Sequence, residues 1–64
     1  MSKSEALAEA RKRWGEAARV WRVYWGPTER AWRVGEKVHR QRIDHGEGLT
    51  FEAAFADADA RGSK

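Results

Sequence analysis

Three apolar residues near the N-terminus recur at helical spacing, which predicts a first helix over residues 4–14. At positions i, i+3 and i+7 they are Leu7, Ala10 and Trp14. The helix can begin with a capping box formed by Ser2 and Glu5, and Ser4 is a competing N-cap. Gly15 follows at the place where a residue in the left-handed conformation is expected to end the helix.

The period of the pattern changes to two in residues 17–25, which predicts the first strand. One face of this strand carries Trp21, Val23 and Trp25, and the other carries Val20, Arg22 and Tyr24. Residues 26–29 contain Gly and Pro at the positions that suit a turn, so the strand is expected to end there.

Residues 30–44 are again β-like, but they allow more than one arrangement. A three-residue loop over residues 35–37 pairs Val34 with Val38 on one face and gives a three-stranded meander. A two-residue turn beginning at Gly35 puts these valines on opposite faces, so we prefer the three-residue loop. A single bent strand is the alternative.

A glycine-rich break at residues 46–48 precedes the second helix. Thr50 is the expected N-cap, and Glu52 suits the positive end of the helix dipole. The apolar face has i, i+3, i+4, i+7 spacing and consists of Phe51, Ala54, Phe55 and Ala58. We expect the helix to end near Ala60 and residues 61–64 to form a frayed tail.

The order of these elements predicts a single small α+β domain over residues 1–64. It is α-β-β-β-α, or α-β-β-α if the middle segment is one strand. Both helices are expected to cover one face of an antiparallel sheet of two or three strands, because neither helix can bury its apolar face alone. The expected interior consists of Leu7, Trp14, Trp21, Val23, Phe51, Ala54 and Phe55. The chain has four Trp residues, which is more than so small a core encloses, so at least one should be partly exposed.

Charge is divided along the chain, although the formal net charge is only +3. Residues 11–42 hold ten basic and three acidic residues, whereas residues 44–60 hold five acidic residues and no Lys or Arg. An uncovered face of the sheet would therefore be electropositive. Arg and aromatic side chains together are typical of protein-binding hot spots and of nucleic-acid surfaces. The candidate partner-binding residues are Arg22, Tyr24, Arg33, Arg40 and Arg42.

Two alternatives to this binding surface remain open. The Arg side chains can lie over the aromatic residues and only keep the sheet solvated. If the partner is a basic channel, the binding surface is instead the acidic face of the second helix. That face consists of Glu52, Asp57 and Asp59.

The sequence predicts neither catalysis nor a cofactor or metal. There is no Cys, so thiol chemistry and cysteine-based zinc sites are excluded. His39, Asp44 and His45 are the one cluster that resembles a metal site, and a metal needs a further ligand. No apolar segment has the roughly 20 residues that span a bilayer. We therefore expect no membrane partner and a cytoplasmic location.

The chain has partial resemblances to two nucleic-acid-binding families. The glycine-rich break and the helix after it resemble the corresponding region of double-stranded-RNA-binding domains, in which two lysines stand at the positions of Phe51 and Glu52. That resemblance implies the topology. Segments 20–25, 30–38 and 50–54 are similar to the arm-binding domains of phage integrases, in which a three-stranded sheet reads DNA with Arg and aromatic side chains.

The chain also resembles the small Arg- and Trp-rich accessory proteins of phages, many of which block a host machine, anti-CRISPR proteins among them. The similarity lies in segments 13–15, 33–35 and 46–55. It implies a non-enzymatic, stoichiometric inhibitor whose partner is a bacterial protein or nucleoprotein complex of the host or its defence. The alternative is a nucleic-acid-binding domain that uses the basic sheet face. We expect a monomer, or a dimer through the edge strand at residues 17–25.

Overall fold

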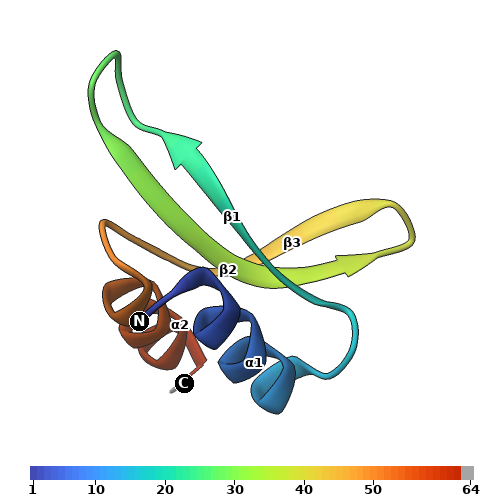
Figure 1. Cartoon of the computed structure of the whole chain (residues 1–64). Helices are drawn as coiled ribbons and strands as arrows, with labels where there is room; N and C mark the ends of the chain where they lie inside the picture. The colour runs from blue at the N-terminus through green and yellow to red at the C-terminus, as the bar shows by residue number, and fades with distance from the viewer. Residues whose placement is uncertain (63–64) are drawn as a thin grey trace.

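The computed structural model describes residues 1–62 and has the order helix, three strands, helix. Its elements are α1 (Lys3–Trp14), β1 (Ala18–Tyr24), β2 (Arg30–Val38), β3 (Gln41–Gly48) and α2 (Phe51–Gly62). The strands form one antiparallel sheet in the order β1-β2-β3, and both helices lie against the same face of it (Figure 1). The predicted α-β-β-β-α fold is confirmed.

The first helix begins with the capping box. The Glu5 N–H donates to the Ser2 hydroxyl at 3.2 Å, and the Ser2 N–H donates to the Glu5 carboxylate at 3.1 Å. Ser4 lies within the helix, so it is not the cap. At the other end, the Gly15 N–H donates to the Arg11 carbonyl at 2.8 Å, with Gly15 at a φ of +82°. Its ψ is −162°, so the expected left-handed helical conformation is wrong, although the φ is positive as glycine allows.

The core lies between the helices and the face of the sheet that carries Val20 and Val34, which are directly opposite each other. The buried cluster consists of Ala6, Ala10, Ala18, Val20, Val34, Phe51, Ala54, Phe55 and Ala58. Leu7, Trp14 and Trp32 pack at its margin. The expected interior was correct for α2 but wrong for Trp21 and Val23, which lie on the other face of β1. The buried residues of α1 are both alanines, and β1 meets this helix with the small side chains of Ala18 and Val20.

The strand β2 runs straight through Gly35, so the predicted loop at residues 35–37 is wrong. The turn lies instead at His39 and Arg40, between the paired residues Val38 and Gln41. Gly35 is required for close packing rather than for a turn, because a Cβ there would collide with the Ile43 carbonyl oxygen. The sheet has a bulge at this point, since Val34 pairs with Gly46 and Gly35 pairs with Asp44.

The glycines of the predicted break lie inside β3, so that part of the prediction is also wrong. A Cβ on Gly46 would collide with the Ala54 carbonyl oxygen and with Ala58, and a Cβ on Gly48 would collide with Ala53. Glycine at these positions lets the backbone of α2 lie directly on the strand.

The second helix begins as predicted, because the Thr50 hydroxyl accepts a hydrogen bond from the Ala53 N–H at 3.0 Å. It continues through Arg61 to Gly62, so the expected frayed tail is wrong for these two residues. Arg61 forms ion pairs with Asp57 and Asp44, which explains why the last turn stays helical. Residues 63 and 64 of the expected tail lie outside the described residues.

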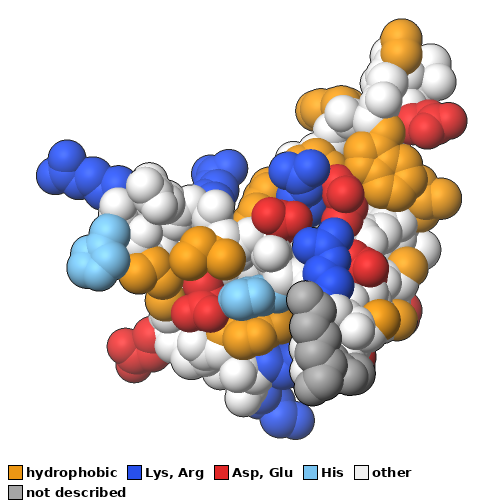
Figure 2. Space-filling model, turned by 180° about the vertical axis from the view of Figure 1, so that it is seen from behind, with side chains coloured by type: hydrophobic (Ala, Val, Ile, Leu, Met, Phe, Trp, Pro, Cys, Tyr) orange, Lys and Arg blue, Asp and Glu red, His pale blue; other side chains and the backbone are white. Residues whose placement is uncertain are grey.

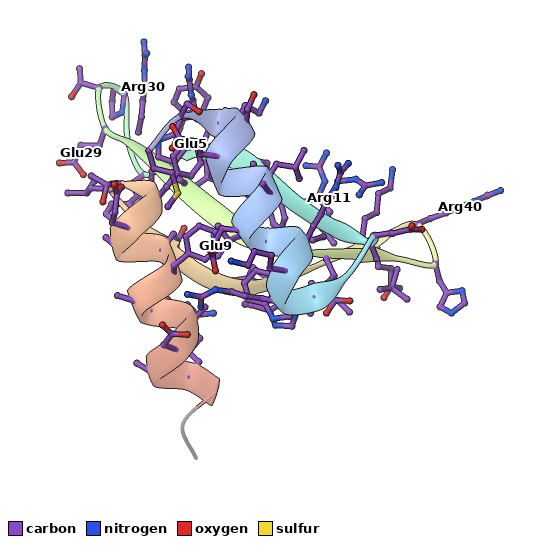
Figure 3. All side chains as sticks on the ribbon, turned by 60° about the horizontal axis from the view of Figure 1, so that its bottom comes forward. Glu5, Glu9, Arg11, Glu29, Arg30 and Arg40 are labelled. Atoms are coloured by element: carbon purple, nitrogen blue, oxygen red, sulfur yellow. The ribbon has the colours of Figure 1, made fainter. Side chains whose placement is uncertain are left out.

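Both hairpins of the sheet extend beyond the helices (Figure 1). Glu29 and Arg30 lie at the end of the β1–β2 hairpin, and Arg40 lies at the opposite end of the sheet, on the β2–β3 hairpin (Figure 3). The helices therefore cover the middle of the sheet and leave both hairpin ends in solvent.

Replacing Phe55 with Ala should lower the free energy of unfolding by about 3–5 kcal/mol, because truncating a buried aromatic residue leaves a cavity. Phe55 is 4% exposed and stacks on Trp14 with 6.2 Å between ring centroids. Chemical denaturation followed by circular dichroism measures the change. Leu49→Ala is the control, since Leu49 is 59% exposed and a surface change is expected to stay within about 0.5 kcal/mol. Equal stability of the two variants would contradict the packing of α2 on the sheet.

Replacing Gly46 with Ala should destabilise the protein by about 1–3 kcal/mol or more, since the added methyl group forces α2 away from β3. Gly26→Ala is the matched control, because nothing lies within 4 Å of a Cβ at that position. Thermal unfolding of the two variants makes the comparison. If Gly46→Ala unfolded at the same temperature as Gly26→Ala, the helix would not lie so close to the strand.

Candidate binding surface

The five predicted binding residues do not share one face of the sheet. Arg22 and Tyr24 alternate with Val20 on β1, so they point to the side of the sheet that carries the helices. Arg33 and Arg42 lie on the opposite side, which neither α1 nor α2 covers. Arg40 lies in the β2–β3 turn. The set therefore divides among the two faces of the sheet and one hairpin tip.

Arg22 covers the margin of the core. Its guanidinium carbon lies 4.9 Å from the centre of the Trp32 ring, and Trp32 packs on Phe51 with 4.3 Å between ring centroids. This arrangement matches the alternative in which arginine lies over an aromatic residue and keeps it from water. Tyr24 is 66% exposed near the end of the same strand.

The uncovered side of the sheet carries a cluster that we call the open face. It consists of Trp21, Val23, Trp25, Arg33, Arg42 and Glu47. Trp21 pairs directly with Arg33 across the β1–β2 ladder. The Arg42 guanidinium carbon lies 5.5 Å from the centre of the Trp21 ring. Trp21 thus lies near two arginines, Arg33 on β2 and Arg42 on β3, and Trp25 is 48% exposed.

Glu47 holds the open face together. Its carboxylate accepts hydrogen bonds from the Trp25 indole N–H at 2.8 Å and from the Arg33 Nε–H at 2.9 Å. The hydrogen bond from Trp25 lowers the pKa of Glu47 from its ordinary value, partial burial acts in the opposite direction, and Arg33 lowers it further. Sequence reasoning did not include Glu47 in the candidate binding surface, because it placed this glutamate in a loop outside the sheet. The pairing of Glu47 with Arg33 becomes visible only when the register of β3 is known.

The network continues from Glu47 to the second helix. The Glu47 N–H donates to the Asp57 carboxylate at 2.9 Å, and Asp57 pairs with Arg61 at 3.0 Å. Arg61 also pairs with Asp44 at 3.3 Å. Figure 2 shows basic and acidic side chains gathered side by side in this way, with hydrophobic side chains next to them.

The three residues of the alternative acidic face do not gather into one free surface. Asp57 contacts β3 and Arg61, as described above. Asp59 pairs with Arg13 of α1, and Glu52 pairs with the amino group of Met1 at 3.3 Å. Each carboxylate of this set therefore has a basic group beside it, in three different places.

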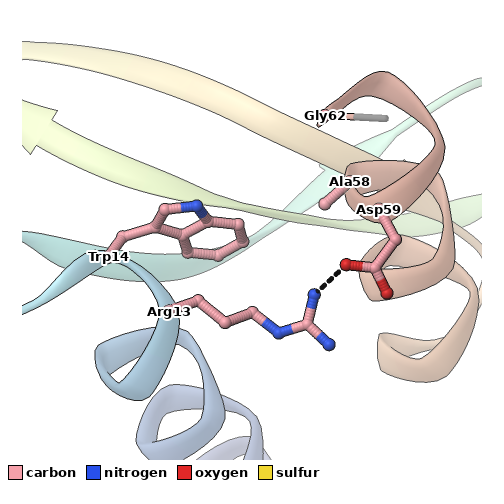
Figure 4. A pocket seen from close by; sticks show the side chains of 5 residues that line it. All are labelled: Arg13, Trp14, Ala58, Asp59 and Gly62. Carbon is pink, nitrogen blue, oxygen red and sulfur yellow. Dashed lines mark hydrogen bonds and ion pairs between the residues drawn. The ribbon is translucent and has the colours of Figure 1, made fainter. Parts of the chain in front are cut away.

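A hollow of about 420 Å³ lies between the C-terminal ends of α1 and α2 (Figure 4). It is lined by Arg13, Trp14, Ala58, Asp59 and Gly62, and the ion pair between Arg13 and Asp59 crosses it. Next to it, His45 stacks on Trp14 with 4.7 Å between ring centroids, and its Nε2 lies 2.8 Å from the Glu36 carboxylate.

The histidines are not brought together. His39 lies in the β2–β3 turn, whereas His45 is packed against Trp14. Within residues 1–62, no group of three His, Cys, Asp or Glu side chains is placed to hold a metal ion. In the same part of the chain, no helix is long and apolar enough to cross a membrane.

Comparison of the chain with protein-family models, with curated proteins and with solved structures found no match. Function must therefore be inferred from the residues of the open face and of the surfaces around it.

Acidification should release Trp25 from Glu47. Because the folded-state pKa of Glu47 is lowered, the stabilisation from its ionised form is present above the unfolded-state pKa and is lost as the pH falls through the folded value. Titrating the Trp25 indole N–H by NMR from about pH 6 to about pH 2 should give a midpoint below the usual glutamate value of about 4.3. Glu47→Gln is the control that removes the transition. A midpoint at or above the usual value would contradict the contact.

Proposed function

We propose that this protein is a non-enzymatic binding module that uses the open face to bind another protein. The observation that carries the proposal is that Trp21 and Trp25 lie on the side of the sheet that neither α1 nor α2 covers. Arg33 and Arg42 lie beside them. Trp and Arg are the side chains that most often dominate protein–protein binding energy. A surface of this composition supports a protein partner with an apolar patch surrounded by carboxylates.

The pairing of Arg33 supports a protein partner over a nucleic acid at this face. Glu47 already pairs with Arg33, so at this point of the face an ion pair, rather than a free cation, lies beside the aromatic side chains. A phosphate backbone favours free cations, whereas the centre of a protein interface favours aromatic side chains and few free charges. The partly exposed Trp25 supplies an anchor that can enter a pocket of the partner.

The resemblance to small phage proteins supports a more specific form of the proposal. In that form the protein is a stoichiometric inhibitor of a bacterial host or defence complex in the bacterial cytoplasm. The alternative form is a nucleic-acid-binding domain that uses the basic, aromatic-bearing sheet.

The experiment compares two neighbouring aromatic residues that point to opposite sides of the sheet. Wild-type protein is used to capture its partner from bacterial lysate treated with nuclease, and affinity for that partner is then measured by calorimetry. Trp25→Ala should weaken binding about 30-fold or more, the effect of losing a hot-spot residue. Tyr24→Ala is the matched control and should bind like the wild type, because Tyr24 is exposed on the other face.

Three results would contradict the proposal. If Tyr24→Ala lost binding and Trp25→Ala did not, the functional side would be the one that carries the helices. A partner released by nuclease would favour the nucleic-acid form. Loss of binding only in Asp57→Lys with Asp59→Lys would favour the acidic helix.

A further inference from the structure

We infer that the tip of the β2–β3 hairpin, residues 37–42, is a second binding element whose ligand is the phosphate backbone of a DNA duplex. This element, the basic hairpin, consists of Lys37, Val38, His39, Arg40, Gln41 and Arg42. The basic hairpin shares Arg42 with the open face, but the inference does not depend on the proposed function of that face, because its evidence comes from the other residues of the hairpin tip. Four observations lead to it: the hairpin projects from the protein, its basic residues have no acidic partner among residues 1–62, its turn is strained, and it contains no aromatic residue.

The basic hairpin projects from the body of the protein. It extends past the helices (Figure 1), and Arg40 reaches furthest at that end of the sheet (Figure 3). The side chains of Lys37, His39, Arg40 and Arg42 are exposed. A ligand can therefore reach both strands and the turn between them without meeting the helices.

The charge on the hairpin is not neutralised by the protein. Residues 37–43 contain no acidic residue, and within residues 1–62 no ion pair joins Lys37, Arg40 or Arg42 to a carboxylate. Lys37 and Arg42 are also directly opposite each other in the ladder, where like charges are unfavourable. Arg13, Arg33 and Arg61, by contrast, all have carboxylate partners. An anionic ligand would relieve this repulsion.

The backbone conformation of the turn is unfavourable for the residues that occupy it. His39 has a φ of +51° and Arg40 a φ of +67°, so both central residues of a two-residue turn are in the left-handed region. Asn-Gly is the usual sequence for such a turn, because other residues are strained there. Backbone strain of this kind is concentrated at functional sites. Its position in the charged turn indicates that the side chains of the turn contact a ligand.

The shape and chemistry of the hairpin select duplex DNA among anionic ligands. A two-stranded ribbon fits the major groove of B-form DNA, which is about 12 Å wide. The major groove of an RNA duplex is too deep and narrow for side chains to read. Single strands are bound through aromatic stacking, and the hot spots of protein interfaces centre on Trp, Tyr and Arg in well-packed surroundings. Residues 37–42 contain no Phe, Tyr or Trp, and their basic side chains are exposed.

The test measures binding to a fluorescent DNA duplex by anisotropy at several salt concentrations between about 50 mM and 200 mM. Wild-type protein should bind, and its affinity should fall steeply with salt. Lys37→Gln with Arg40→Gln should weaken binding at least tenfold and lower the salt slope by about 2, one unit for each lost phosphate contact. Arg11→Gln with Lys12→Gln is the matched control. It removes the same charge from exposed positions on α1 and should keep the wild-type slope.

A turn replacement separates binding from folding. His39→Asn with Arg40→Gly supplies the favoured turn sequence, so this variant should melt at a higher temperature than the wild type and yet bind the duplex more weakly. Trp25→Ala should bind the duplex like the wild type. Failure of duplex binding would thus leave the protein-partner result of the open face unaffected.

The inference is wrong if wild-type protein does not bind the duplex at the lowest salt concentration. It is also wrong if the control on α1 loses as much affinity as the hairpin variant, because binding would then follow net charge alone. Equal affinity for single-stranded DNA or for duplex RNA would overturn the choice of ligand. Displacement of the duplex by polyglutamate at equal charge concentration would overturn it in favour of an acidic protein.

Discussion

The close approach of α2 to β3 is the constraint on which the rest of the molecule depends. Glycine at positions 46 and 48 lets the helix backbone lie on the strand, because a Cβ at either position would collide with the helix. The buried residues of α1 are alanines, which face the small side chains of β1. An interior packed this closely has room for few large side chains, and Phe51 and Phe55 are the aromatic residues that enter it.

The tryptophans therefore lie around the core rather than in it. Trp14 and Trp32 flank the two phenylalanines at the margin, and Arg22 covers Trp32 from the solvent side. Trp21 and Trp25 lie on the open face among arginines and Glu47. These tryptophan side chains, which a thicker domain would bury, are thus kept in place at the surface by contacts with charged residues. The same tight packing that stabilises the fold accounts for the surface on which the proposed function rests.

Sequence patterns within a few residues predicted the helices, the strands and the helix caps. Which face of each strand is buried depends on long-range packing, which these patterns do not specify. The capping box at Ser2 and the N-cap at Thr50 depend on residues three positions apart, so the sequence is sufficient to find them. The buried face of β1 depends on which side the helices approach. Alternation alone favours the large Trp21, whereas the alanines of α1 meet the smaller Val20.

The role of the glycines and the membership of the candidate site were hard to predict for the same reason. Both depend on where the neighbouring strands and helices lie, which local sequence does not specify. Gly35 and Gly46 suit a turn as well as a close contact, and only the position of the neighbouring backbone distinguishes the two. Charge segregation identified Arg33 and Arg42 as surface residues, but the division of the five candidates between two faces follows from register.

His45 is an extra, unpaired residue in β3, and it reverses the alternation of side chains halfway along the strand. Before it, Arg42 points to the uncovered side of the sheet. After it, Gly46 and Gly48 face α2, although all three residues are even-numbered. A single unpaired residue thereby decides which even-numbered positions of β3 meet the helix. A change of side chain at Arg42 leaves α2 untouched, whereas any side chain at Gly46 or Gly48 collides with it.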